Sequence, residues 1–470
     1  MSGELFLSST ESVCPECLRT ISAVRLERGD EIVLSKECPE HGSFEAVIWR
    51  GSPSFEGWGE GGTGREGDHA ITEPISPPHP FTLSPPLSCP RACGLCPDHR
   101  QHTCTALIEV TQRCNLSCPY CFADGGNSRA DDPGMDAIAA SFEQLLQAGG
   151  PYNVQMSGGE PTLRDDLPEI IAMGRSMGFD FIQVNTNGLR VAGDPAYARE
   201  LKDAGAASLF LQFDGLRDST YVRLRGRPLS KEKQLAVENC AGHGLGVVLV
   251  PTLVPGVNVD QIGDIIRFGL ERLPGVRGVH FQPVSYFGRY PAPPGYEGRI
   301  TLPEVLRAIE AQTEGMINPD YFKPPGCENA YCSFHGNFVL LENGELRALT
   351  RRATDQPCCK PGPVQAGDVQ ARSFVSRFWA HPSTETCACC TEPATLSLGG
   401  WDMFIDRART HSFSISAMVF QDAWNLDLER LKQCCIHVVH PDGRIIPFCA
   451  YNLTDSRGSF MHRARGSRGA

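Results

Sequence analysis

The sequence predicts an α/β protein built around a partial barrel of six β-α units, with cysteine-rich segments on both sides. Two observations predict the barrel: six short strand-like segments recur between residues 107 and 285, and segments with helical spacing separate them. A third observation concerns the flanks, because the chain has 21 cysteines, many in pairs or triplets with short spacings. At 470 residues the chain is long enough for about three domains.

Six segments are predicted as strands of a parallel sheet: Leu107–Thr111, Asn153–Ser157, Phe181–Asn187, Ser208–Asp214, Val247–Val254 and Val279–Ser285. Several of them alternate polar and apolar residues, as in Asn153, Gln155 and Ser157. Strands covered by helices on both faces are instead apolar throughout. We therefore predict that one face of the sheet is polar and lines a cavity for a polar ligand.

The first 50 residues contain two similar turns, Cys14-Pro-Glu-Cys17 and Cys38-Pro-Glu-His41, with a predicted strand at Ile32–Leu34 between them. Three sulfurs and one nitrogen form a plausible tetrahedral site for zinc or mononuclear iron, with a structural role. Residues 1–50 are therefore predicted to be a metal-knuckle domain of the zinc-ribbon or rubredoxin type. Residues 51–86, rich in glycine and then in proline, are predicted to be a linker.

Two hairpins are predicted in a C-terminal domain over residues 301–470. The first turns at Asn343-Gly344 and the second at Asp442-Gly443, which are strong signals for two-residue turns. Counting outward from the second turn places Cys449 beside Cys435 at the open end of the hairpin. Thiols at the open ends of the hairpins indicate an auxiliary iron–sulfur domain.

A C-x3-C-x2-C motif, formed by Cys114, Cys118 and Cys121, comes directly after the first predicted strand. Three thiolates in one loop bind three irons of a 4Fe–4S cluster and leave the fourth iron open. The open iron can chelate the amino and carboxylate groups of S-adenosylmethionine (SAM), so that an electron from the cluster breaks the sulfonium C–S bond. A plain metal knuckle or three core thiols would be the alternative.

The segment Ser157-Gly-Gly-Glu-Pro-Thr162 ends the second predicted strand, and with the cysteine motif in this order it resembles the radical SAM superfamily. The resemblance implies a partial (β/α)6 radical SAM barrel over residues 106–300, with a cluster on Cys114, Cys118 and Cys121. It also implies two sets of SAM-binding residues. Gly158, Gly159 and Glu160 contact the methionine end, while Asn185 and Gln212 meet the carboxylate or ribose. For Gln212, where Ser or Thr is more usual, polar packing inside the barrel is the other interpretation.

Further cysteines indicate one or two auxiliary 4Fe–4S clusters. Residues 87–105 repeat the C-x3-C-x2-C spacing at Cys89, Cys93 and Cys96, and the remaining ligand there is Cys104 or a C-terminal thiol. The C-terminal candidates are Cys327, Cys332, Cys434, Cys435 and Cys449, and the roles of Cys358, Cys359, Cys387, Cys389 and Cys390 stay open. Cys240 is predicted to be a core residue.

Three blocks, Cys93–Thr103, Phe281–Arg289 and Cys434–Asn452, resemble the archaeal tetraether lipid synthase family and its bacterial relatives. Members of this family have also been labelled 7,8-dihydro-6-hydroxymethylpterin methyltransferases. The resemblance implies that a 5′-deoxyadenosyl radical removes hydrogen from lipid alkyl chains, which are then joined by C–C bond formation. The alternatives are a radical SAM methyltransferase acting on a pterin or related heterocycle, and a non-catalytic iron–sulfur electron carrier.

Charge and hydropathy restrict the partners. With 43 basic against 55 acidic side chains the net charge is −12, which argues against nucleic acid as a partner. No signal peptide and no apolar run of roughly 18 residues is evident, so we expect a cytoplasmic protein without a transmembrane segment, open to peripheral membrane contact. The expected partners are SAM, a lipid or pterin substrate, and a low-potential electron donor such as ferredoxin or flavodoxin.

Overall fold

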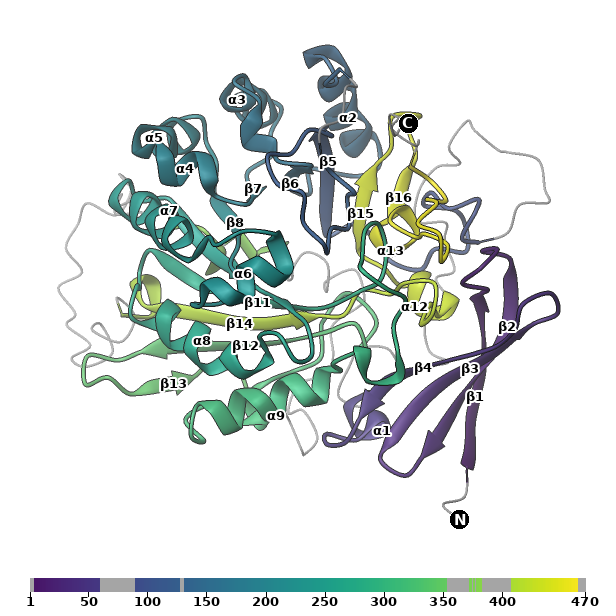
Figure 1. The fold of residues 1–470 in the computed structure, drawn as a ribbon. Helices are drawn as coiled ribbons and strands as arrows, with labels where there is room; N and C mark the ends of the chain where they lie inside the picture. Colours follow the sequence, from purple (N-terminus) through teal and green to yellow (C-terminus); the bar gives the residue numbers. More distant parts are fainter. Residues whose placement is uncertain are drawn as a thin grey trace.

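Figure 1 shows the computed structural model of the protein. The structure describes residues 4–59, 89–126, 131–352, 372–373, 375–376, 378–382 and 407–463. Most of the predicted linker lies outside these residues, as do Cys358, Cys359, Cys387, Cys389 and Cys390. Within the described ranges, no helix is both long and apolar enough to cross a membrane.

The N-terminal segment forms a four-stranded antiparallel sheet in chain order, made of β1 (Glu4–Val13), β2 (Thr20–Arg28), β3 (Glu31–Cys38) and β4 (Gly42–Arg50). The sequence predicted only the middle of β3. The β1–β2 and β3–β4 turns bring the two metal-knuckle motifs together at one end of the sheet. Helix α1 (Phe55–Gly59) follows and buries Trp58 completely, so the start of the Gly-rich segment contributes to the core.

A single sheet of 12 strands forms the centre of the molecule. Its parallel part confirms the six predicted strands: β5 (Thr105–Thr111), β6 (Asn153–Gly158), β7 (Ile182–Thr186), β8 (Ser208–Gln212), β9 (Gly246–Val250) and β11 (Val276–Pro283). The short β10 (Thr252–Leu253) pairs with the end of β11. This sheet is the α/β partial barrel that the spacing predicted.

Helices cover the apolar face of the sheet, as Figure 1 shows for α2, α3, α5 and α7. The longer helices are α2 (Met135–Gln147), α3 (Leu167–Ser176), α4 (Leu189–Gly193), α5 (Pro195–Asp203), α6 (Asp218–Arg225), α7 (Ser230–Gly242), α8 (Ile262–Leu270) and α9 (Leu302–Gln312). Short 3-10 turns occur at η1 (Pro161–Leu163), η2 (Val259–Gln261), η3 (Tyr296–Gly298) and η4 (Pro319–Tyr321). The buried core includes Cys240, as predicted.

The C-terminal strands extend both edges of the central sheet. Next to β11 the order continues with β14 (Ser412–Met418), β12 (Ser333–Leu340) and β13 (Leu346–Ala348). At the other edge β15 (Ile436–Val439) pairs in parallel with β5 and is followed by β16 (Ile445–Pro447) and α13 (Phe448–Tyr451). Segments that follow the barrel in the chain therefore border it at both edges. The domain boundaries drawn from composition stay predictions.

The register predicted for the hairpins is wrong by one residue. In the second hairpin Val439 pairs with Ile445, and the amide of His440 donates to the carbonyl of Arg444 at 2.8 Å, so the loop has three residues rather than two. Gly443 takes φ +95° in this loop. The first hairpin has the same loop length. Because β16 ends at Pro447, Cys449 lies in α13 instead of a strand.

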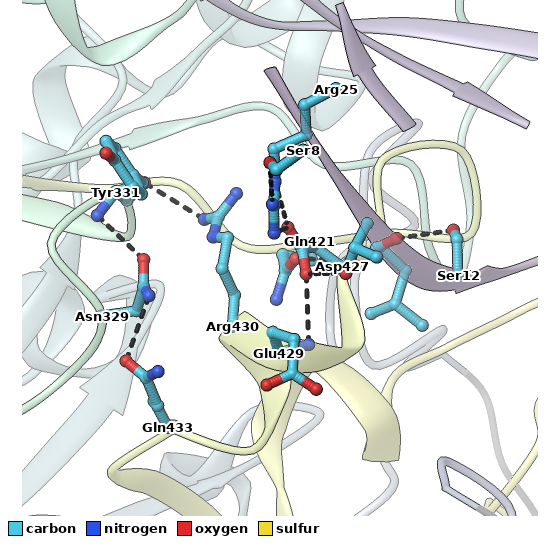
Figure 2. Close-up of polar contacts among 12 residues, drawn as sticks. Ser8, Ser12, Arg25, Asn329, Tyr331, Gln421, Asp427, Glu429, Arg430 and Gln433 are labelled. Carbon is cyan, nitrogen blue, oxygen red and sulfur yellow. Dashed lines mark hydrogen bonds and ion pairs between the residues drawn. The ribbon is translucent and has the colours of Figure 1, made fainter. Parts of the chain in front are cut away.

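Asp427 joins the N-terminal sheet to the C-terminal helix α12 (Leu428–Leu431), as Figure 2 shows. Its carboxylate accepts hydrogen bonds from Thr10 Oγ1 at 2.8 Å and Arg25 Nε at 3.0 Å, and from the amide of Glu429, which caps the helix. The side chains of Arg25 and Asp427 are only 8% and 2% exposed. This buried ion pair links β2 to the start of α12.

Candidate functional site

The loop after β5 carries Cys114, Cys118 and Cys121 along the wall of a cavity of about 560 Å³. Backbone hydrogen bonds fix the loop at both ends. The Cys114 amide donates to the carbonyl of Gly126 at 2.9 Å, and Cys121 exchanges two 2.9 Å bonds with Arg289. The three thiols are therefore presented from one fixed segment.

The Gly-Gly-Glu motif after β6 packs directly against this cysteine loop. The amides of Gly159 and Glu160 donate to the carbonyls of Thr111 and Arg113, each at 2.8 Å. A β-carbon on Gly158 or Gly159 would come within 2.1 Å of those same carbonyl oxygens. The glycines are thus required by the close approach of two backbone segments, and all three residues of the motif also line the cavity.

The Glu160 carboxylate is buried and links the ends of β6 and β7. It accepts hydrogen bonds from the amide and hydroxyl of Thr162 at 3.1 and 2.6 Å, from Thr186 Oγ1 at 2.7 Å and from the amide of Asn187 at 2.6 Å. Much of its hydrogen-bonding capacity is therefore used within the protein. Through these hydrogen bonds Glu160 holds the cavity wall in position.

The polar face predicted from strand alternation lines the cavity with Gln155, Asn185, Gln212, His280 and Gln282. Gln155 accepts from Asn185 Nδ2 at 3.1 Å, and Gln212 accepts from Lys233 Nζ at 3.2 Å. The Oδ1 atom of Asn185 is buried without a hydrogen-bond partner. An unpaired buried acceptor is costly, so this atom fits a donor on a bound ligand.

A buried ion pair that the sequence analysis missed lies behind the cysteine loop. Arg225 on α6 forms two 2.6 Å bonds to Asp214 and donates to the carbonyl of Tyr120 at 3.1 Å. Burial raises the pKa of the Cys118 thiol, and the nearby Arg225 partly offsets that rise. The Asp-Gly after β8 and the Arg-Gly at the end of α6 were visible in the sequence, but nothing local showed that they pair.

The loop fits a 4Fe–4S cluster that binds SAM. It offers three soft thiolate ligands in one segment and no fourth cysteine from the motif, which leaves one iron open. Burial raises the pKa of Cys114 to about 12 in the free thiol, so bound iron is what would stabilise its thiolate. The unpaired Asn185 oxygen and the amides of Gln155 and Gln212 line the same cavity.

A second thiol group opens into the same cavity. Cys104, Cys327 and Cys435 have sulfur atoms within 4.8 Å of one another, and those of Cys327 and Cys435 are 3.3 Å apart. All three line the cavity together with Cys114, Cys118 and Cys121. The structure thus places Cys104 with C-terminal thiols rather than with the upstream triplet.

The other predicted auxiliary ligands are neighbours of Cys434, although no three of them have ligand atoms within 4.8 Å of one another in the described residues. Hydrogen bonding with Cys89 and burial raise the pKa of Cys93 well above its ordinary value, with Cys96 and Cys434 as further neighbours. Burial raises the pKa of Cys434 in the same way, with Cys449 and Cys332 nearby. The adjacent Cys434 and Cys435 therefore belong to different groups, which the predicted hairpin count did not separate.

The N-terminal motifs form the predicted four-ligand group. The ligand atoms of Cys14, Cys17, Cys38 and His41 all lie within 4.8 Å of one another, and His41 Nδ1 is 3.4 Å from the Cys38 sulfur. The hydrogen bond from His41 lowers the pKa of Cys38 to about 6. This donor set fits a tetrahedral zinc or iron ion.

Comparison with known proteins decides the family. Residues 108–269 match the radical SAM superfamily, and residues 6–50 match the HMPTM N-terminal zinc ribbon domain. The chain is 34% identical over 481 residues to the 7,8-dihydro-6-hydroxymethylpterin dimethyltransferase of Methanocaldococcus jannaschii, and this alignment covers 94% of the chain and 93% of that protein. The chain belongs to the radical SAM superfamily.

Other matches cover less of the chain. A probable GTP 3′,8-cyclase of Methanothermobacter marburgensis is 31% identical over 172 residues, which is 36% of this chain and 55% of that protein. Among solved structures, Streptococcus suis SuiB bound to SAM is 16% identical with a TM-score of 0.37, covering 46% of this chain and 48% of that one. Membership confirms a radical SAM enzyme, with the 4Fe–4S cluster and SAM that this superfamily uses.

Proposed function

We propose that this enzyme activates a C–H bond of a substrate held between the loop of Cys114, Cys118 and Cys121 and the group of Cys104, Cys327 and Cys435. The observation that carries the proposal is that both thiol groups line one cavity. When bound, the cluster on the first group and SAM supply a 5′-deoxyadenosyl radical. The second group would hold an auxiliary cluster on the other side of the substrate.

SAM would lie along the strand ends between these groups. Gly158 and Gly159 keep the backbone close to the cysteine loop, and Glu160 holds the ends of β6 and β7. The unpaired Asn185 Oδ1 is placed to accept a bond from SAM, and Lys233 orients Gln212 from behind. These are the SAM-binding residues that the sequence predicted. Glu160 would act by holding the strand ends in place.

Our first candidate reaction is methyl transfer to a reduced pterin or related heterocycle. It is supported by the full-length relative, whose name gives a pterin dimethyltransferase. The end of the cavity beside β8 also suits a flat heterocycle. There Phe210 and Trp379 stack with centroids 5.6 Å apart, next to His280, whose Nδ1 is 2.8 Å from Ser416 Oγ. Burial lowers the pKa of His280 to about 4, so a neutral ring faces the ligand.

The second candidate is C–C coupling of lipid alkyl chains, as in tetraether formation. The observation in its favour is a group of aromatic rings that line the cavity near the cysteine loop: Phe122, Phe287, Phe420 and Phe448. The ring centroids of Phe420 and Phe448 lie 4.5 Å apart. A cavity wall made of such aromatic rings suits an alkyl chain. An alkyl C–H has no useful acidity, so coupling of this kind requires radical chemistry.

The remaining assignments concern electrons and structure. We assign auxiliary iron–sulfur clusters to the remaining thiol groups, zinc to Cys14, Cys17, Cys38 and His41, and reduction to a low-potential carrier such as ferredoxin or flavodoxin. Formation of 5′-deoxyadenosine from SAM under reducing, anaerobic conditions distinguishes this enzyme from a non-catalytic electron carrier.

One experiment separates the two reactions. Reconstituted enzyme is given SAM with a deuterated methyl group, together with either a reduced hydroxymethylpterin or dialkyl lipid. If the reaction is methyl transfer, the pterin gains a methyl group, and mass spectrometry shows whether that group carries the deuterium of SAM. If the reaction is coupling, the lipid loses two hydrogens for each new C–C bond. If 5′-deoxyadenosine forms with neither product, both candidate substrates are wrong.

A further inference from the structure

Glu328 lies directly beside the second thiol group. Its Oε2 is 2.9 Å from the sulfur of Cys327 and 3.4 Å from that of Cys435, and the side chain lines the cavity. Its Oε1 accepts a hydrogen bond from Ser333 Oγ at 2.5 Å. One carboxylate oxygen is therefore held by the start of β12, and the other is directed at the thiols.

The thiols of this group leave one coordination position to fill. A 4Fe–4S cluster presents four irons, and Cys104, Cys327 and Cys435 account for three of them. Two further cysteines in the described part of the chain, Cys332 and Cys434, interact with Cys449 instead and are not within ligand distance of this group. The Glu328 carboxylate is the anionic group in contact with two of the three thiols.

We propose that Glu328 is the fourth ligand of the auxiliary cluster held by Cys104, Cys327 and Cys435. A carboxylate oxygen is a harder ligand than a thiolate and suits the soft iron–sulfur unit less well, so this corner exchanges more readily. Because Glu328 faces the cavity, the exchangeable iron faces the substrate. The inference rests on the proposed function only in requiring a cluster at these three thiols.

The test uses the full chain in a Cys114→Ala, Cys118→Ala, Cys121→Ala background, which removes the SAM-binding cluster with its open iron. Reduced protein is examined by electron paramagnetic resonance with and without cyanide, and iron is counted. Glu328→Gln removes the proposed ligand, while Glu328→Cys replaces it with a tightly held thiolate. Glu429→Gln is the matched control, because Glu429 pairs with exposed Arg100 and with Lys432.

We expect Glu328→Cys to keep its iron, to shift the g values of one cluster and to abolish the cyanide response. We expect Glu328→Gln to shift the same signal without cyanide, and Glu429→Gln to match the background protein. Wild-type spectra and cyanide response in both Glu328 variants would overturn the proposal. Loss of about four irons, the content of one cluster, from both Glu328 variants would also overturn it, because Glu328→Cys still supplies a ligand at this position.

Separate results test the underlying assignment. Cys327→Ala in the same background should remove about four irons, the content of one cluster. If it does not, the proposed cluster itself is absent. If it does and the Glu328 variants are unchanged, only the assignment of Glu328 fails.

Discussion

Gly158 and Gly159 occupy positions where a side chain would collide with the backbone of the cysteine loop. Gly158 also has φ +121°, which disfavours residues with a β-carbon. Alanine at either position must push the Gly-Gly-Glu segment away from the carbonyls of Thr111 and Arg113. We expect Gly158→Ala to destabilise the protein by about 2–4 kcal/mol and to weaken SAM binding.

Thermal unfolding and equilibrium SAM binding measure these two effects. Gly134→Ala is the matched control, since Gly134 has φ −67° and no atom within 4 Å of a built β-carbon. A Gly158→Ala protein as stable as Gly134→Ala, with unchanged SAM affinity, would contradict the argument from close approach.

Lys233 gives the folded state a pH dependence. Burial lowers its pKa from 10.5 to about 8, although Nζ donates to the carbonyl of Asn187 and to Gln212. Between pH 8 and 10.5 the unfolded chain binds this proton and the folded chain does not, so stability rises with pH across that window. We expect the stability of wild type relative to Lys233→Met to rise by about 3 kcal/mol between pH 7.5 and 10.5.

Denaturant unfolding of wild type and Lys233→Met at the two pH values measures the difference between their free energies of unfolding. The other titrating groups are the same in both proteins, so their contributions cancel. The exposed Lys202 supplies the control, because Lys202→Met should leave the wild-type pH dependence intact. A pH-independent difference for Lys233→Met would show that the amine keeps its proton when buried.

Single residues also show what the sequence could predict of the site. Cys114, Cys118 and Cys121 were predictable because their spacing is local, and Asn185 because alternation placed it on the polar face. The ion pair of Asp214 and Arg225 was not predictable from spacing, since it depends on how α6 turns back over β8. Glu328 was missed for the same reason: its thiol neighbour Cys435 is 107 residues away in sequence.

At the level of elements, strands were more predictable than their partners. The six parallel strands have a strong alternating or apolar pattern, and each formed. The register of each hairpin depends on whether its loop has two or three residues. Asp442-Gly443 does not specify this length, because a glycine at positive φ fits either loop. The insertion of β14 between β11 and β12 is a long-range pairing that no local signal indicates.

A buried ion pair between Arg25 and Asp427 joins β2 to α12, as Figure 2 shows. Asp427→Asn leaves the Arg25 guanidinium buried without its carboxylate, which we expect to cost about 3–5 kcal/mol. The N-terminal sheet should then become sensitive to protease under conditions where the barrel resists. Glu40→Gln, which breaks the exposed pair with Arg19, should cost no more than about 1 kcal/mol.

Thermal unfolding combined with limited proteolysis checks this prediction. If Asp427→Asn and Glu40→Gln unfold at the same temperature and resist protease equally, the junction is held by other contacts. One such contact is Lys36, whose Nζ donates to Ser12 Oγ at 2.9 Å and to the carbonyl of Ala423 at 2.7 Å.

The whole molecule brings its cysteines together from segments that are far apart in the chain. The group facing the cavity draws Cys104 from before β5, Cys327 from after the barrel and Cys435 from the start of β15. This grouping exists because β15 pairs in parallel with β5, with Ile436 beside Thr105, so Cys435 lies next to Cys104 at the start of β5. Spacing predicts groups made within one loop, but it does not predict groups made by topology.

Because the metal groups are built on separate elements, we expect them to load independently. His41→Ala should abolish the N-terminal metal, which metal analysis reads as the loss of about one zinc per chain, and should leave iron content and 5′-deoxyadenosine formation intact. Cys114→Ala with Cys118→Ala and Cys121→Ala should lose about four irons and all 5′-deoxyadenosine formation while keeping the zinc. His41 lies at the end of the four-stranded sheet and outside the cavity that the two groups of Cys114, Cys118 and Cys121 and of Cys104, Cys327 and Cys435 line, which is the reason for the separation. A fall in iron on His41→Ala would instead mean that the N-terminal sheet holds the auxiliary thiols in place through the Asp427 junction.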